Sequence, residues 1–108
     1  MSGRVLIVGG GPAGLACAIA LRLKGLCVEV LEGKTWPRDR VCGEGIMPTG
    51  WAVLERLGVT TYLGPEDCSE FAGIRYWDDD GRTARGPFPE GIGRGVRRQA
   101  LSRALHRR

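Results

Sequence analysis

The sequence predicts a mixed α/β fold that opens with a β-α-β unit. The aliphatic run from Arg4 to Val8 ends abruptly in glycine, which is typical of a buried strand. The alanine- and leucine-rich run from Ala13 to Lys24 predicts a helix. Its apolar face is marked at helical spacing by Leu15, Ile19 and Leu23. A second strand is predicted from Cys27 to Leu31, so that a right-handed crossover joins two parallel strands.

The next part of the chain is predicted to be a long loop followed by a helix. Glycines and prolines interrupt residues 33–47 and leave no room for a regular helix before about position 48. A helix is then expected from Thr49 to Leu57, with Gly58 as its end. Its apolar stripe consists of Trp51, Leu54 and Leu57. We expect this stripe to pack in the core.

The last third of the chain predicts a β-hairpin and a final helix. Residues alternate in the β manner from Phe71 to Trp77, and an Asp-Gly pair at positions 80 and 81 indicates a hairpin turn. The segment from Arg82 to Arg85 is expected to pair back on the first strand. Residues 86–95 are a glycine-rich link, and a helix is expected to begin near Arg98. Its apolar positions are Leu101 and Leu105.

Composition and charge limit the classes of function. The 108 residues fit one domain, and the net charge is +4. Much of the positive charge lies near the end of the chain, in Arg94, Arg97, Arg98, Arg103, Arg107 and Arg108. A solvated helix face accounts for most of these arginines better than a nucleic acid does, because no RNA- or DNA-binding module accompanies them. The N-terminal apolar stretch is broken by glycines and a proline, so neither a signal peptide nor a transmembrane segment is predicted.

Cysteine and histidine usage argues against metal and triad chemistry. The four cysteines form no CxxC pair, which favours reduced thiols and a cytoplasmic location. His106 is the only histidine, so neither a serine-type triad nor a multi-histidine metal site can be built. The acidic run from Asp78 to Gly81 lacks the rest of a calcium-binding loop, and a hairpin turn explains it better.

A glycine-rich motif lies where the first strand turns into the first helix. Gly9, Gly11 and Gly14 satisfy the G-x-G-x-x-G pattern, and the acidic Glu32 closes the next strand. In this pattern the first glycine permits the sharp turn, the second lets backbone approach a pyrophosphate, and the third lets the helix pack on the strand. Pro12 suits the first turn of the helix. The sequence therefore predicts a dinucleotide site, with the phosphates at the helix N-terminus and a ribose on Glu32.

The segment after Glu32 favours FAD over NAD. In nicotinamide-dependent dehydrogenases the second strand leads fairly quickly into another crossover helix. Here it leads into the broken loop from Gly33 to Met47 instead, which would offer backbone N–H groups, Arg38 and Arg40 to an extended ligand. The carboxylate of Glu32 would repel a 2′-phosphate, which argues against NADP in this position. A glycine turn that binds nothing is the structural alternative.

Four motifs together resemble a known family. They are GGGPAG at positions 9–14, Glu32, the loop at residues 37–45, and Arg98-Gln99-Ala100-Leu101. In these the chain is similar to geranylgeranyl-reductase-like and para-hydroxybenzoate-hydroxylase-like FAD-dependent oxidoreductases, whose FAD domain is of the glutathione-reductase type. The first motif is shared by many flavoproteins, whereas the Cys-Gly-Glu-Gly loop and the Arg-x-x-Leu are more selective. The resemblance spans nearly the whole chain but only the N-terminal part of such enzymes.

The resemblance implies roles for individual residues. The residue matching Ala13 contacts the pyrophosphate, and the loop matching Cys42 to Gly45 passes near the flavin. The cofactor-binding residues expected on all these grounds are Gly9, Gly11, Pro12, Ala13, Gly14, Glu32, Arg40, Cys42, Gly43, Gly45 and Arg98. The alternative for Arg98 is one more surface arginine. Cys42 is the one catalytic candidate, since nearby arginines would lower the pKa of its thiol, and the alternative is a small residue that fits the loop.

The resemblance also implies a domain organisation. Residues 1–66 would form the first part of a Rossmann-like FAD-binding domain. Residues 67–92 would form a β-hairpin excursion that starts a β-rich substrate domain, and residues 93–108 would be a truncated helix returning to the FAD domain.

The implied activity is that of a flavin-dependent oxidoreductase with FAD as cofactor and NAD(P)H as reductant of the full-length enzyme. Its substrate would be a small organic molecule. Reduction of isoprenoid double bonds and hydroxylation of an organic substrate both remain open, and an isoprenoid substrate would bring peripheral contact with a membrane. The fragment alone is expected to be inactive. The alternatives are a non-catalytic dinucleotide-binding fragment and a fragment of an NAD-dependent dehydrogenase.

Overall fold

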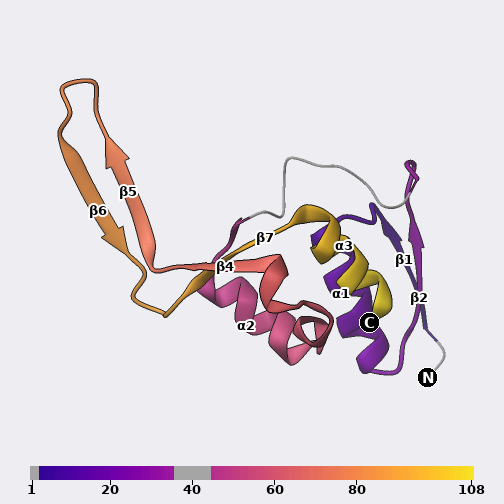
Figure 1. Ribbon diagram of the computed structural model, residues 1–108. Helices are drawn as coiled ribbons and strands as arrows, with labels where there is room; N and C mark the ends of the chain where they lie inside the picture. Colours follow the sequence, from indigo (N-terminus) through magenta and orange to yellow (C-terminus); the bar gives the residue numbers. More distant parts are fainter. Residues whose placement is uncertain (1–2, 36–44) are drawn as a thin grey trace.

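The chain begins with the β-α-β unit that the sequence predicts (Figure 1). The computed structural model describes residues 3–35 and 45–108. Strands β1 (Arg4–Val8) and β2 (Cys27–Leu31) have the predicted bounds and pair in parallel, with helix α1 (Pro12–Leu23) between them in the chain. The helix begins one residue earlier than expected because Pro12 takes its first position, where a proline loses no hydrogen bond. Gly25 follows the helix with φ of +85°, a conformation that favours glycine.

A three-stranded antiparallel sheet forms the middle of the molecule, in the order β3-β7-β4. Its strands are β3 (Gly45–Ile46), β4 (Cys68–Phe71) and β7 (Gly93–Val96). Both β3 and β7 fall in segments expected to be irregular, so that expectation is wrong at these positions. The pairing of Gly45 with Gly95 joins glycine-rich segments that lie far apart in sequence, and glycine carries no side-chain pattern from which a strand is recognised.

The predicted hairpin is present and extends away from the rest of the chain (Figure 1). It consists of β5 (Gly73–Trp77) and β6 (Thr83–Pro87). The single strand expected from Phe71 to Trp77 is divided at Ala72, which separates the end of β4 from the start of β5. In the turn, the Asp78 side chain accepts hydrogen bonds from the Asp80 and Arg82 backbone N–H groups, which confirms a turn at this acidic run.

The helices enclose the core. Helix α2 (Pro48–Arg56) is followed by the 3-10 turns η1 (Val59–Tyr62) and η2 (Pro65–Asp67), and helix α3 (Arg98–Arg107) lies beside α1 (Figure 1). The buried residues that pack together are Ile19, Leu54, Leu57, Val59, Val96, Leu101, Ala104 and Leu105. This confirms the predicted inward faces of the last two helices. Leu23 is 53% exposed, contrary to expectation, because it is the last residue of α1 and lies outside this cluster.

One face of the β1-β2 pair is open, which the sequence did not indicate. Leu6 is 57% exposed, Val8 81% and Leu31 46%. These side chains share one face of the sheet, since Leu31 lies opposite Val8 in the register and strand residues alternate between faces. Helix α1 covers the other face. The prediction of fully buried strands is therefore wrong, because only one face of the β1-β2 pair is covered. Among residues 3–35 and 45–108, no helix combines the length and apolar character needed to cross a membrane.

Candidate cofactor-binding site

The turn after β1 has the conformation expected of the glycine motif. Gly9 has φ of +105°, a region that L side chains rarely adopt. Its N–H donates to the Leu31 carbonyl oxygen at 2.7 Å, which joins the ends of β1 and β2. The turn therefore fixes the start of α1 at the carboxyl end of both strands, where ligands bind in open α/β sheets.

Gly14 makes the close packing of α1 on this turn possible. A Cβ at position 14 would lie 2.0 Å from the Gly9 carbonyl oxygen and 3.1 Å from its carbon, and these are backbone atoms that cannot rotate away. The close approach predicted for the third glycine of the motif is thus confirmed. Its part in binding a cofactor stays a prediction.

The N-terminus of α1 presents backbone donors. Gly11 is the N-cap, Pro12 the first helical residue, and the Leu15 N–H makes a helical bond to the Gly11 oxygen at 2.9 Å. The N–H groups of Ala13 and Gly14 precede that bond, in the part of a helix that has no partner within it. No side chain of the described residues caps this end, and its first turn holds no acidic residue. The donors and the positive end of the helix dipole are therefore set to receive an anion.

The carboxylate of Glu32 lies beside this helix end. Its Oε1 accepts a hydrogen bond from the Gly10 N–H at 3.0 Å, and its Oε2 accepts one from the Lys34 N–H at 3.0 Å. The residue directly follows β2, so the strand pairing and the Gly9 turn bring its side chain to the glycine loop. The structure thus brings together Gly9, Gly11, Pro12, Ala13, Gly14 and Glu32 at one edge, as the motif predicts. The ribose as the ligand of Glu32 stays a prediction.

The remaining candidate residues belong to other parts of the chain. Gly45 is the first residue of β3 and is exposed, and Arg98 is the half-buried first residue of α3. Arg40, Cys42 and Gly43 lie outside the described residues, as does Arg38, so the structure neither supports nor opposes their expected roles. In the parts of the chain that the structure describes, no group of three or more metal-ligating side chains is found.

The C-terminal arginines are not all on a solvated helix face, which corrects the expectation for three of them. Arg94 lies on β7, with its guanidinium carbon 4.7 Å from the centre of the Trp51 ring. Arg97 is the N-cap of α3 and pairs with Asp67 at 3.1 Å. Arg108 donates from its Nε to the Leu57 carbonyl oxygen at 2.6 Å, where α2 ends. The sequence carries no local signal for these partners, because each comes from a distant segment.

Two titratable groups near these contacts have shifted pKa values. The Gly64 backbone N–H, at 3.0 Å, and then the Arg97 side chain hold the pKa of Asp67 below its usual value. Burial raises the pKa of the Cys68 thiol, and the nearby Asp67 carboxylate adds to the effect. Cys68 is therefore a protonated, half-buried thiol with no sign of activation.

Comparison with protein families gives a match over most of the chain. Residues 3–85 match the family described as "FAD binding domain". This range contains the glycine motif, Glu32 and the segment that leads into the hairpin.

Curated relatives match more than half of this chain, but the match covers only a short segment of each relative. Menaquinone reductase of Mycolicibacterium smegmatis is 42% identical over 59 residues, which are 55% of this chain and 14% of that protein. Squalene epoxidase 6 of Arabidopsis thaliana is 36% identical over 85 residues, 79% of this chain and 16% of that protein. FAD-dependent monooxygenase sdgC of Emericella nidulans is 41% identical over 66 residues, 60% of this chain and 14% of that protein. The chain thus spans about a seventh of the length of the relatives that it matches.

Solved structures share the fold over nearly the whole chain. The tetrameric form of 2-methyl-3-hydroxypyridine-5-carboxylic acid oxygenase superposes with a TM-score of 0.78 and 27% identity, covering 98% of this chain and 28% of that one. The flavin-dependent brominase Bmp2 superposes with a TM-score of 0.80 and 25% identity, covering 97% of this chain and 27% of that one. The α/β fold, the glycine turn and these matches agree, and the chain belongs to the FAD binding domain family.

Proposed function

We propose that this chain holds the ADP half of FAD at the start of α1. The observation that carries the proposal is the close placement of two complementary groups: uncapped N–H donors at Ala13 and Gly14, and the Glu32 carboxylate 3.0 Å from the Gly10 nitrogen. The donors suit the two linked phosphates, and the carboxylate suits the hydroxyls of the adenosine ribose. Gly9 and Gly11 contribute backbone without side chains.

The fit of this edge to a dinucleotide rests on geometry as well as on charge. A side chain at position 14 would drive the helix start away from the turn, and one at position 9 would strain the backbone. Both effects would displace the amides that receive the phosphates. Among the described residues, no side chain caps these donors and the first turn of α1 holds no acidic group that would repel a phosphate.

The other predicted residues would act farther along the cofactor. We place Gly45 and Arg98 beside the part of FAD beyond the pyrophosphate, together with Arg40, Cys42 and Gly43. The support for this step is the resemblance of the Cys-Gly-Glu-Gly loop and the Arg-x-x-Leu to flavoprotein motifs. When bound, FAD supplies the redox chemistry, and the residues of this chain bind and orient it.

For the longer enzyme we propose a flavin-dependent oxidoreductase that acts on a small organic molecule and takes electrons from NAD(P)H. Named relatives include a reductase, an epoxidase and an oxygenase, so reduction and oxygenation of the substrate are both supported. The names menaquinone reductase and squalene epoxidase favour a lipid-like substrate and with it peripheral contact at a membrane. The cytoplasmic location that we propose rests on the absence of a CxxC pair among the cysteines. A geranylgeranyl-reductase-like activity is one form of this proposal.

A second candidate function is a dinucleotide-binding module without turnover. The observation that favours it is the make-up of the site, because backbone N–H donors and the Glu32 carboxylate bind a ligand but carry no redox group of their own. Such a module would have the same dinucleotide-binding site as the proposed enzyme but no catalytic site.

Binding of four ligands to the purified chain tests the proposal. We expect FAD and ADP to bind, and FMN to bind more weakly because it lacks the adenosine and one of the two linked phosphates. Steady oxidation of NAD(P)H by the FAD-loaded chain would rule out a module without turnover, whereas absence of oxidation is expected under both proposals. Equal affinity for FMN and FAD would contradict the placement of the ADP half at α1, and NAD binding without retention of FAD would favour a dehydrogenase fragment.

A further inference from the structure

Arg94 occupies the middle of a row of residues that crosses the β3-β7-β4 sheet. It lies opposite Ile46 of β3 on one side and opposite Glu70 of β4 on the other. Its Nη2 lies 3.4 Å from the Glu70 Oε1, and its Nη1 donates to the Ile92 carbonyl oxygen at 3.0 Å. The side chain is only 23% exposed, which is low for an arginine, so the guanidinium is held by contacts on several sides.

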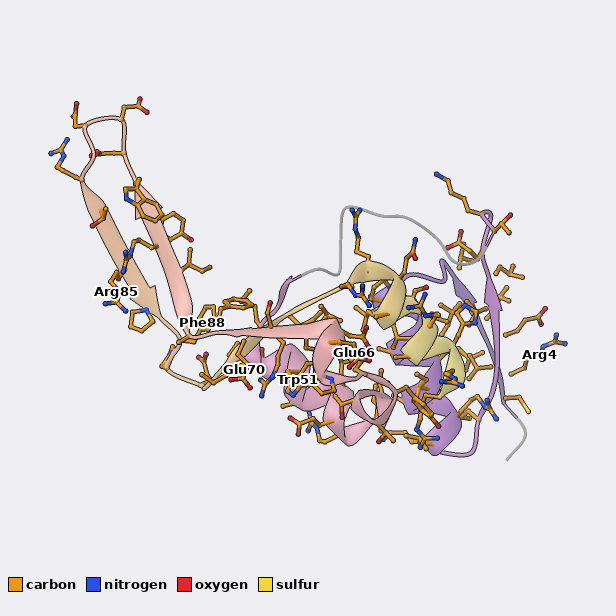
Figure 2. The ribbon with its side chains drawn as sticks, viewed as in Figure 1. Arg4, Trp51, Glu66, Glu70, Arg85 and Phe88 are labelled. Atoms are coloured by element: carbon orange, nitrogen blue, oxygen red, sulfur yellow. The ribbon has the colours of Figure 1, made fainter. Side chains whose placement is uncertain are left out.

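The same guanidinium also packs on helix α2. Its central carbon lies 4.7 Å from the centre of the Trp51 ring, within the range of a cation-π contact. Trp51 and Glu70 are both labelled in Figure 2, where they lie close to the start of the hairpin. One side chain thus connects β4, β7 and α2, and its backbone pairs with β3.

These contacts fix the corner between β3 and α2. Only Met47 separates the end of β3 from the start of α2, so a contact with Trp51 restrains the strand as well as the helix. Gly50 of α2 lies close to β3, because a Cβ there would be 3.3 Å from the Cγ2 of Ile46. Gly45 is the first residue of this corner and pairs with Gly95, the neighbour of Arg94.

We infer that Arg94 is a positioning residue, which sets the backbone of Gly45 for the part of FAD that lies beyond the ADP half. The inference rests on the proposed function, and it adds a residue that the sequence motifs do not contain. Arg94 itself has no need to touch the cofactor, since it acts through the β3-α2 corner. The ADP half is held by α1 and Glu32, in the separate β1-β2 unit. Loss of Arg94 should therefore weaken FAD binding selectively.

The experiment compares FAD and ADP affinities, by calorimetry, in the full chain and in Arg94→Met. Methionine keeps an apolar stem over Trp51 and removes the charge. We expect the Kd for FAD to rise about tenfold, a loss of about 1.4 kcal/mol of binding that reflects a less well-ordered Gly45, and the Kd for ADP to stay within about twofold. Arg94→Lys, which restores a cation, should recover part of the loss. The matched control is Arg75→Met, because Arg75 also lies over a tryptophan, Trp77, at 5.8 Å but within the hairpin; it should change neither Kd.

A second readout does not depend on the cofactor. Amide NMR shifts of Gly45 and Ile46 should move in Arg94→Met and stay in place in Arg75→Met. Parallel weakening of FAD and ADP, or an unchanged FAD affinity, would overturn the inference while the proposed function stands. A parent chain that binds ADP and not FAD, or neither, would remove the proposed function and the inference with it. If Arg94→Met does not fold, Arg94→Lys and Glu70→Gln decide by the same ratio of FAD to ADP affinity.

Discussion

Replacement of Gly14 by alanine is the sharpest perturbation of the site. The new Cβ would lie 2.0 Å from the Gly9 carbonyl oxygen, and Cβ atoms essentially never come within 3.0 Å of a heavy atom from a non-neighbouring residue. The helix start and the turn would therefore have to separate by about 1 Å, which is overpacking against rigid backbone. Such overpacking costs about 3 kcal/mol at the upper end of its usual range.

Alanine also favours the helix over glycine, by up to about 1 kcal/mol, and this partly offsets the clash. The net loss in the free energy of unfolding for Gly14→Ala is then about 2 kcal/mol, which lowers the Tm of a domain of this size by roughly 8 to 16 °C. Circular dichroism during heating measures the Tm. ADP binding by calorimetry should weaken as well, because the displaced helix end carries the N–H donors.

Gly50→Ala is the matched control. Gly50 is the third residue of α2, after Pro48 and Thr49, just as Gly14 is the third residue of α1, after a proline and one more residue. Its new Cβ would lie 3.3 Å from the Cγ2 of Ile46, a side-chain atom that can give way by a few tenths of an ångström. We expect a change within about 0.5 kcal/mol. A Gly14→Ala chain as stable as the parent, or a Gly50→Ala chain damaged equally, would refute the reasoning.

Three further predictions concern single side chains. Glu32→Ala should lower the free energy of unfolding by about 1 to 3 kcal/mol in urea titrations, because the N–H of the buried Gly10 loses its acceptor; an unchanged urea midpoint would contradict that bond. The pKa of Asp67 is lowered in the folded chain, so its ionised form stabilises the fold above its ordinary pKa of 3.8, and this contribution is lost as the pH falls through the lowered value. The urea midpoint of the parent should therefore fall more steeply in acid than that of Asp67→Asn, and parallel curves would count against the shift. Leu101→Ala should cost about 2 to 5 kcal/mol, since this side chain is 1% exposed, whereas Leu23→Ala at 53% exposure should cost far less; similar losses would mean that the core is misplaced.

The parts of the fold that the sequence predicts correctly are those with local signals. The strand bounds of β1 and β2 follow from short apolar runs that end at glycine or at a charged residue. Helix α3 follows from Leu101 and Leu105 at helical spacing, and both are buried. The placement of Glu32 beside the glycine loop follows from the same unit, because a parallel crossover brings the ends of its strands to one edge.

What the sequence does not reveal depends on distant partners. Strand β7 consists of two glycines, Arg94 and Val96, and its pairing with β3 and β4 is not indicated by this local composition. Arg94 resembles its cationic neighbours in the sequence, and only the approach of Trp51 and Glu70 distinguishes it. The exposure of Leu6 and Val8 is likewise not predictable from the sequence. An aliphatic strand is predicted to be buried whether or not a second layer covers it.

The central claim is that the N-terminus of α1 and the Glu32 carboxylate together receive ADP. An amide NMR titration of the chain with ADP tests it most directly. We expect the largest shift changes to fall on Gly11, Ala13 and Gly14, and we expect Glu32→Gln to weaken ADP binding. Shift changes concentrated on the cationic surface of α3, at Arg103 and Arg107, with an affinity that is indifferent to Glu32, would contradict it.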